Sequence, residues 1–136
     1  MQDSRRETDS SFIMRGPTVF ILSVLTGVLL ELSIQAVSGQ REAWDSGLYF
    51  AIGIPAAMFV SAMLGFRSRG RQWIWTLLII PSQVTTMMVR SGEIGAFWPL
   101  MVALSALLSA PFVGAAAIGA AFRSATQRSR SVPNDS

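Results

Sequence analysis

The sequence predicts an all-α fold, an integral-membrane four-helix bundle. Hydrophobic residues make up 51% of the 136 residues and charged residues only 14%, which is too apolar for an ordinary soluble domain of this length. The apolar residues gather in four long stretches instead of recurring at amphipathic spacing. Each stretch is close to the roughly 20 residues that a helix needs to cross about 30 Å of hydrocarbon.

Four helices are predicted, at about residues 17–38, 48–66, 73–90 and 97–122. Together they form one transmembrane domain over residues 15–123, and the short connections leave no room for a second domain. Polar, serine-containing tails flank this domain at residues 1–14 and 124–136. We expect both tails to be disordered, because they contain too few apolar residues to form a core.

The first predicted helix carries a polar face. Ser23, Gly27, Glu31 and Gln35 recur at four-residue spacing, which places them on one side of a helix. Glu31 is the only acidic residue within a predicted span. We expect this face to contact other helices and not lipid.

The start of the chain also has features of a cleaved signal peptide. Arg5, Arg6 and Arg15 precede the apolar stretch, and Ala36-Val37-Ser38 forms a loose cleavage site. The apolar stretch continues past Glu31, however, which favours a retained helix over a signal peptide.

Small residues at four-residue spacing predict packing faces on the second and fourth helices. These residues are Gly53, Ala57, Ser61 and Gly65 on the second helix, and Ala106, Ala110 and Gly114 on the fourth. Small side chains allow close backbone approach, on which helix association in lipid depends. Two interpretations stay open with equal weight: packing within one chain, or a face that forms a homo-oligomer.

The third predicted helix offers a polar surface that matches Glu31. Gln83, Thr86 and Arg90 lie three to four residues apart, so they share a helix face. From the predicted depths we expect Glu31 to contact Arg90, with Gln35 and Gln83 completing an intramembrane polar network. A charged Asp, Lys or Arg near the membrane centre costs roughly 2.5–3.5 kcal/mol on insertion scales, so a buried carboxylate needs a partner or a proton. The network would either lock the first and third helices together, which we favour, or bind a proton or a cation.

Prolines interrupt three of the predicted spans. Pro99 falls in the first turn of the fourth helix, where a missing N–H costs little. Pro55, Pro81 and Pro111 fall inside predicted helices. We expect each of these three to free a carbonyl group and bend the helix axis.

The distribution of arginines predicts the orientation. All 11 basic residues are arginines. Nine of them lie in the two tails and the second connector: Arg5, Arg6, Arg15, Arg67, Arg69, Arg71, Arg123, Arg128 and Arg130. The other two connectors hold one each, Arg41 and Arg90. Because positively charged residues are retained on the cytoplasmic side, both termini are expected in the cytoplasm, with residues 39–47 and 90–95 outside.

The two halves of the sequence resemble each other weakly. The pairs Arg15-Gly16 and Ser38-Gly39 recur as Arg69-Gly70 and Ser91-Gly92. This pattern suggests a tandem repeat of a two-helix hairpin. The alternative is that any protein with this topology places such residues at the ends of its spans.

The composition excludes several classes of function. Cysteine and histidine are both absent, so thiolate chemistry and the commonest metal ligand and general base are excluded. We therefore expect no enzyme, no metal and no cofactor. The arginines form no single patch with exposed aromatics, so nucleic acid is not an expected partner. The expected partners are the lipid bilayer and either further copies of the chain or a larger membrane complex.

The sequence favours a non-catalytic accessory or oligomer-forming component of a cell membrane, such as a bacterial inner membrane. The alternative is a small proton- or cation-coupled transporter that uses Glu31. In architecture alone the chain is similar to the small multidrug-resistance transporters, which also combine four spans with a carboxylate in the first helix. It lacks the aromatic and glycine signatures of that family.

Overall fold

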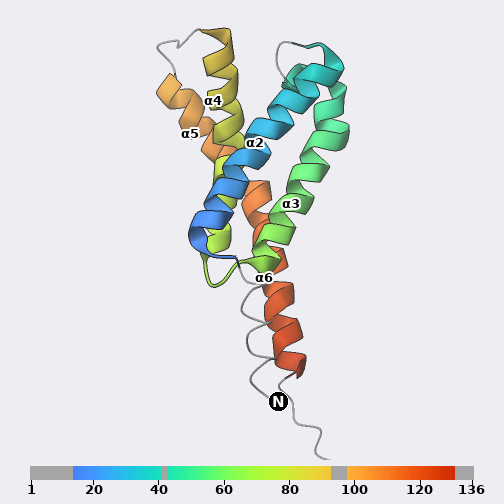
Figure 1. Cartoon of the computed structure of the whole chain (residues 1–136), viewed down its shortest axis with the longest axis vertical. Coiled ribbons are helices and arrows are strands. Elements are labelled where there is room, and N and C mark those ends of the chain that lie inside the picture. Colours follow the sequence, from blue (N-terminus) through green and yellow to red (C-terminus); the bar gives the residue numbers. More distant parts are fainter. Residues whose placement is uncertain (1–13, 41–42, 93–97, 131–136) are drawn as a thin grey trace, which may run out of the picture.

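The structure is a computed structural model that describes residues 14–40, 43–92 and 98–130. Within these ranges the chain is helical and contains no strand, which confirms the predicted all-α class. It begins with α2 (Gly16–Ser38) and ends with α5 (Trp98–Leu108) and α6 (Ala110–Arg130) (Figure 1). The elements between them are η1 (Ala43–Asp45), η2 (Tyr49–Gly53), α3 (Ile54–Arg67), η3 (Gln72–Leu78) and α4 (Ile79–Ser91).

Three stretches are long and apolar enough to cross a membrane: Gly16–Ser38, Tyr49–Arg67 and Trp98–Ser129. The third predicted helix, at about residues 73–90, is not among them. It begins as the seven-residue 3-10 segment η3 and continues as the 13-residue α4. A 3-10 segment of this length is uncommon, since its hydrogen bonds are poorer than those of an α-helix.

The three internal prolines lie at joints between helical segments. Pro55 follows the π-helical turn η2 and is the second residue of α3. Pro81 follows η3 and is the third residue of α4. Pro111 follows a break at Ser109 and is the second residue of α6. Each proline thus lies where a helical run changes its winding or breaks, and at Pro55 and Pro81 the preceding residues are themselves helical. A proline at such a position leaves a carbonyl of the preceding turn without its intrahelical donor.

The last helix is longer than predicted. α6 continues to Arg130, so residues 124–130 are helical and do not form the expected disordered tail. This stretch contains neither glycine nor proline to end the helix. Its hydroxyl groups at Ser124, Thr126 and Ser129 donate to carbonyls one turn earlier. The predicted tails at 1–13 and 131–136 lie outside the described residues.

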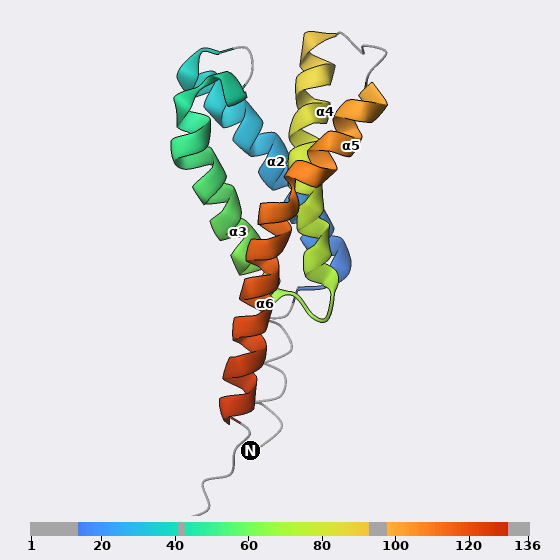
Figure 2. The same ribbon diagram turned by 180° about the vertical axis from the view of Figure 1, so that it is seen from behind.

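The helices form two crossing pairs. α2 packs against η3 and α4, while α3 packs against α6. The helices come together at the end of the bundle where α2 and η3 begin and α3 ends. This end is here called the joined end. At the opposite end, here called the split end, α2 and α3 lie side by side in one arm and α4 and α5 in another (Figures 1 and 2). The final turns of α6 project past the joined end.

Glycine sets the distance between the crossing helices. A Cβ atom on Gly27 would lie 2.0 Å from Oγ of Ser82 and 2.2 Å from the carbonyl oxygen of Ile79. The backbones of α2 and α4 therefore touch at this point. At the second crossing, a Cβ atom on Gly65 would lie 1.9 Å from the carbonyl oxygen of Ala116. Gly119 of α6 makes the reciprocal contact: a Cβ atom on it would lie 2.0 Å from the carbonyl oxygen of Ala62 in α3.

The predicted small-residue face of α3 is buried along its whole length, at Gly53, Ala57, Ser61 and Gly65. It packs within the chain, against α2 at Gly53 and against α6 at Gly65.

The face predicted for the fourth helix does not pack within the chain. Ala110 and Gly114 are exposed, and Ala106 is only half-buried. The buried residues of this region are instead Ser105, Ser109, Phe112, Ala115, Ala116 and Gly119. These positions follow one another at helical spacing through Ser109, so α5 and α6 bury a neighbouring stripe of the same helical run and leave the predicted stripe on the outside. Of the two interpretations, packing within one chain does not apply to this face, and a face that forms a homo-oligomer stays a prediction.

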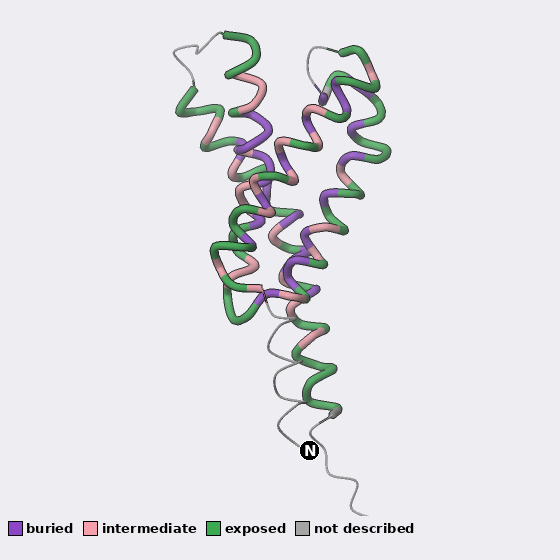
Figure 3. Tube along the Cα trace, in the orientation of Figure 1, coloured by how far each residue is buried: buried purple, intermediate pink, exposed green. Residues whose placement is uncertain are grey.

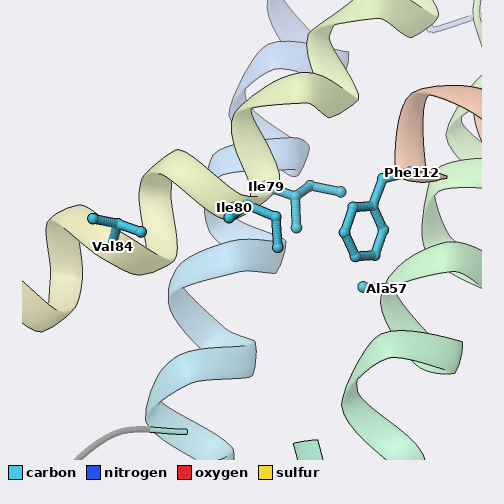
Figure 4. Packing of buried hydrophobic residues seen from close by; sticks show 5 residues of the cluster. All are labelled: Ala57, Ile79, Ile80, Val84 and Phe112. Atoms are coloured by element: carbon cyan, nitrogen blue, oxygen red, sulfur yellow. The ribbon is translucent and has the colours of Figure 1, made fainter. Parts of the chain in front are cut away.

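A small apolar core fills the region between the crossings. Ile79, Ile80 and Val84 of α4 meet Phe112 of α6 and Ala57 of α3 (Figure 4). Buried positions recur along the inner sides of all helices, while the outer sides are exposed (Figure 3). The core therefore joins the two crossing pairs into one bundle.

The crossing of α3 and α6 predicts that two glycine substitutions differ in their effect on stability. Gly65→Ala should destabilise the protein by about 1–3 kcal/mol, the usual cost of overpacking, because the new methyl group meets backbone atoms that cannot rotate away. Gly114→Ala is the matched control, since nothing lies within 4 Å of its added Cβ. Reversible unfolding in mixed detergent micelles, followed by circular dichroism, measures both. Equal losses would contradict a tight crossing at Gly65.

Candidate functional site

The candidate site is a buried polar cluster near the split end, formed by the side chains of Glu31, Gln35, Tyr49 and Gln83. It draws on α2, η2 and α4, and the backbone of Ala43 in the α2–α3 connection completes it. Glu31 and Gln83 are each 0% exposed. A polar group removed from water in this way requires hydrogen-bond partners, so its contacts determine its chemistry.

Glu31 ties its own helix to the connection that follows. Its Oε1 accepts a hydrogen bond from Nε2 of Gln35 at 2.6 Å and another from the backbone N–H of Ala43 at 3.3 Å. Ala43 itself is fully buried in η1. The carboxylate therefore holds the α2–α3 connection against the end of α2. Glu31 and Gln35, two members of the predicted network on one face of the first helix, are thus hydrogen-bonded to each other.

Tyr49 links the first arm to α4. Its hydroxyl donates to Oε1 of Gln83 at 3.0 Å, and it also interacts electrostatically with the Glu31 carboxylate. Tyr49 opens the π-helical turn η2, in which the N–H of Ile54 bonds to the Tyr49 carbonyl five residues earlier. The wider turn accommodates Pro55, which has no N–H to offer. Tyr49 is thereby directed into the core, where it is 3% exposed.

The side-chain amide of Gln83 is only partly satisfied. Its Oε1 accepts from Tyr49, but among the described residues no acceptor lies within hydrogen-bond distance of its Nε2. A buried N–H group without an acceptor costs free energy, typically about 1–3 kcal/mol. The cluster thus contains a donor directed into the protein interior and available to a further acceptor.

Two residues of the predicted network lie apart from this cluster. Thr86 donates its hydroxyl to the carbonyl of Ser82 on its own helix. Arg90 is exposed at the end of α4, and no ion pair joins it to Glu31 in the part of the chain that the structure describes. The cause is the split between the arms: α2 and α4 touch at Gly27 and diverge toward the ends where Glu31 and Arg90 lie (Figure 1).

Sequence reasoning missed Tyr49 and the backbone of Ala43. Tyr49 is the only tyrosine in the chain and lies at the start of an apolar stretch, the place where an amphipathic ring is expected. That position could have identified it as a partner for Glu31. The contribution of Ala43 could not be found in this way, because any residue supplies a backbone N–H.

The cluster predicts two different outcomes in double-mutant cycles. Glu31→Gln combined with Gln35→Leu should be non-additive by about 0.5–2 kcal/mol, because the two side chains are hydrogen-bonded. Glu31→Gln combined with Arg90→Gln is the control and should be additive within roughly 0.5 kcal/mol. Unfolding free energies of the single and double variants in micelles provide the measurement. Coupling to Arg90 of the same size as to Gln35 would contradict this arrangement.

The described residues of the cluster offer hydrogen bonding, packing and proton binding at a carboxylate. Across residues 14–40, 43–92 and 98–130, no group of three or more histidine, cysteine, aspartate or glutamate residues could hold a metal ion. Comparison with known protein families, with curated proteins and with solved structures yields no match to this chain. Its function therefore has to be inferred from its own residues and their arrangement.

Proposed function

We propose that this chain is a multi-pass component of a cell membrane that acts by packing and association and not by catalysis. The observation that carries the proposal is the inverted distribution of polarity. The interior holds a carboxylate, two glutamine side chains and several hydroxyl groups, whereas large apolar side chains cover the outside. A protein that exposes this much apolar surface is suited to hydrocarbon and not to water.

The exposed apolar side chains belong to every arm of the bundle. Examples are Leu29 of α2 at 59% exposure, Phe59 of α3 at 68% and Leu107 of α5 at 70%. The polar residues opposite them face inward: Ser23, Ser61, Thr76, Ser105 and Ser109 are nearly or fully buried. Their hydroxyl groups donate to carbonyls within the preceding turn, so these five hydroxyl groups are satisfied without water.

Length supports a fourth crossing by η3 and α4. At about 2.0 Å per residue for a 3-10 segment and 1.5 Å for an α-helix, the two together extend roughly 33 Å. That length matches a hydrocarbon thickness of about 30 Å. The greater rise per residue of the 3-10 segment therefore makes up the length that the short α4 lacks. This length supports a four-span arrangement, which places both termini on the same side of the membrane.

The placement of arginines supports the expected orientation. Arg15 precedes α2, Arg67 ends α3, and Arg71 precedes η3, all at the joined end. Arg123 also reaches this end, where its Nη1 donates to the carbonyl of Ser68. We infer that the joined end faces the cytoplasm, because positive charge is retained there.

A structural role for the buried carboxylate supports a non-catalytic component. Glu31 binds a side chain on its own helix and a backbone N–H of the following connection, so it fixes a loop in place. This arrangement positions no nucleophile beside it. The interface to other copies or to a larger complex would then be formed by the outer apolar surface.

The topology can be tested directly because the natural chain contains no cysteine. Single cysteines at Ser4 and Ser136 should resist a membrane-impermeant maleimide in intact cells, while Gly47→Cys and Ser91→Cys should react. Both of the latter positions are exposed at the split end. Labelling after permeabilisation serves as the control for reactivity. Reaction of either terminus from outside would contradict the proposed orientation.

A second candidate function is a proton- or cation-coupled transporter, which the fully buried Glu31 carboxylate supports, because a carboxylate within a membrane span can bind and release a proton. In that case proteoliposomes containing the protein should show pH-dependent flux. The flux should disappear with Glu31→Gln while the helical circular dichroism signal persists, because the glutamine cannot release a proton. The control is Arg90→Gln, which changes an exposed residue outside the cluster and keeps the Glu31 carboxylate with its partners. If flux is absent, or is unaffected by Glu31→Gln, the non-catalytic component is favoured.

A further inference from the structure

We infer that the joined end carries a binding site for an anionic phospholipid, formed by Arg15, Arg71 and the aromatic pair Phe20–Trp75. The site lies on the outer surface between α2 and η3. It depends on the membrane location proposed above, and it adds to that location a ligand of defined chemistry.

The two helices that form the site begin side by side. Gly16 is the first residue of α2 and Gln72 the first of η3. A Cβ atom on Gly16 would lie 3.6 Å from Cδ of Gln72, which is ordinary van der Waals contact. The residue before each helix is an arginine, and both Arg15 and Arg71 are exposed. Contact between the helix starts thus brings together two cationic residues from distant parts of the sequence.

An apolar surface lies directly beyond the two arginines. The rings of Phe20 and Trp75 pack edge to face, with centroids 5.5 Å apart and an interplanar angle of 83°. Both rings remain accessible, at 43% and 42% exposure. From Arg15 to Phe20 along an α-helix, and from Arg71 to Trp75 along a 3-10 segment, the distance is in each case about 8 Å. The two helices therefore present cationic and apolar groups at matching depths.

The charge at this end has no acidic counterpart in the described structure. Among residues 14–40, 43–92 and 98–130, the acidic residues are Glu31 and Asp45, and both lie toward the split end. A ligand that complements the site must combine negative charge at the level of the arginines with hydrocarbon at the level of the rings. A phospholipid with a net negative headgroup has this form, whereas a zwitterionic lipid carries its own compensating cation.

Quenching of tryptophan fluorescence by brominated lipid tests the site. The substitutions Trp44→Phe, Trp73→Phe and Trp98→Phe leave Trp75 as the only tryptophan. This protein is reconstituted in phosphatidylcholine nanodiscs that contain a small fraction of either brominated phosphatidylglycerol or brominated phosphatidylcholine. We expect the anionic lipid to quench at several-fold lower mole fraction. Arg15→Gln and Arg71→Gln should each weaken this preference by roughly five-fold, the contribution of one arginine near a charged surface.

Arg69→Gln is the matched control, because Arg69 is exposed in the same connector but lies before the turn at Gly70. It removes the same charge and should leave the preference nearly unchanged. Equal quenching by the two lipids, or an equal effect of Arg69→Gln and Arg71→Gln, would overturn the site while leaving the membrane location intact. Absence of quenching by either lipid would instead contradict the membrane location itself.

Discussion

The close backbone approach of helices at glycine is the constraint on which the rest of the structure depends. Gly27 allows α2 to touch α4, and Gly65 with Gly119 allows α3 to touch α6. In hydrocarbon, helices gain little from burying apolar side chains, because lipid solvates those equally well. Contact at these glycines replaces that driving force with dense van der Waals packing. It also brings polar atoms of one helix against the backbone of the other: the hydroxyl of Ser82 and the carbonyl oxygen of Ile79 both lie against Gly27.

The position of the crossings determines the shape of the polar cluster. Because α2 and α4 touch at Gly27, they are still close one turn later, where Gln83 reaches Tyr49. At the same level, Glu31 bonds to groups of the first arm, Gln35 and the backbone of Ala43. Farther along, the arms have separated, and α2 has α3 and its connection as neighbours in place of α4. The same geometry explains why an arginine near the end of α4 lies outside the cluster.

Much of the helix placement could be predicted from the sequence, because it depends on local composition. The apolar stretches located the helices, and four-residue spacing identified the buried face of α2 and the small-residue face of α3. The segment types could not be predicted, since a π turn before Pro55 and a 3-10 segment before Pro81 are alternatives of similar energy to a kink.

Nor could the partners of Glu31 be predicted. The sequence indicates how deep a residue lies in the membrane, but pairing also depends on the crossing angle and on the rotation of each helix about its axis. The same rotation decides which of two neighbouring stripes the last helical run buries within the chain, and it is the stripe through Ser105, Ser109 and Phe112.

The contacts of Glu31 have a consequence for biosynthesis. Its hydrogen-bond partners Gln35 and Ala43 follow it within 12 residues, so both bonds to Oε1 can form as soon as the first hairpin has been synthesised. Gln83 differs, because its acceptor oxygen binds Tyr49, which belongs to that earlier hairpin. The first hairpin can therefore make these contacts before the later helices are synthesised. The order in which the ribosome delivers the segments matches the order in which their polar groups can be satisfied.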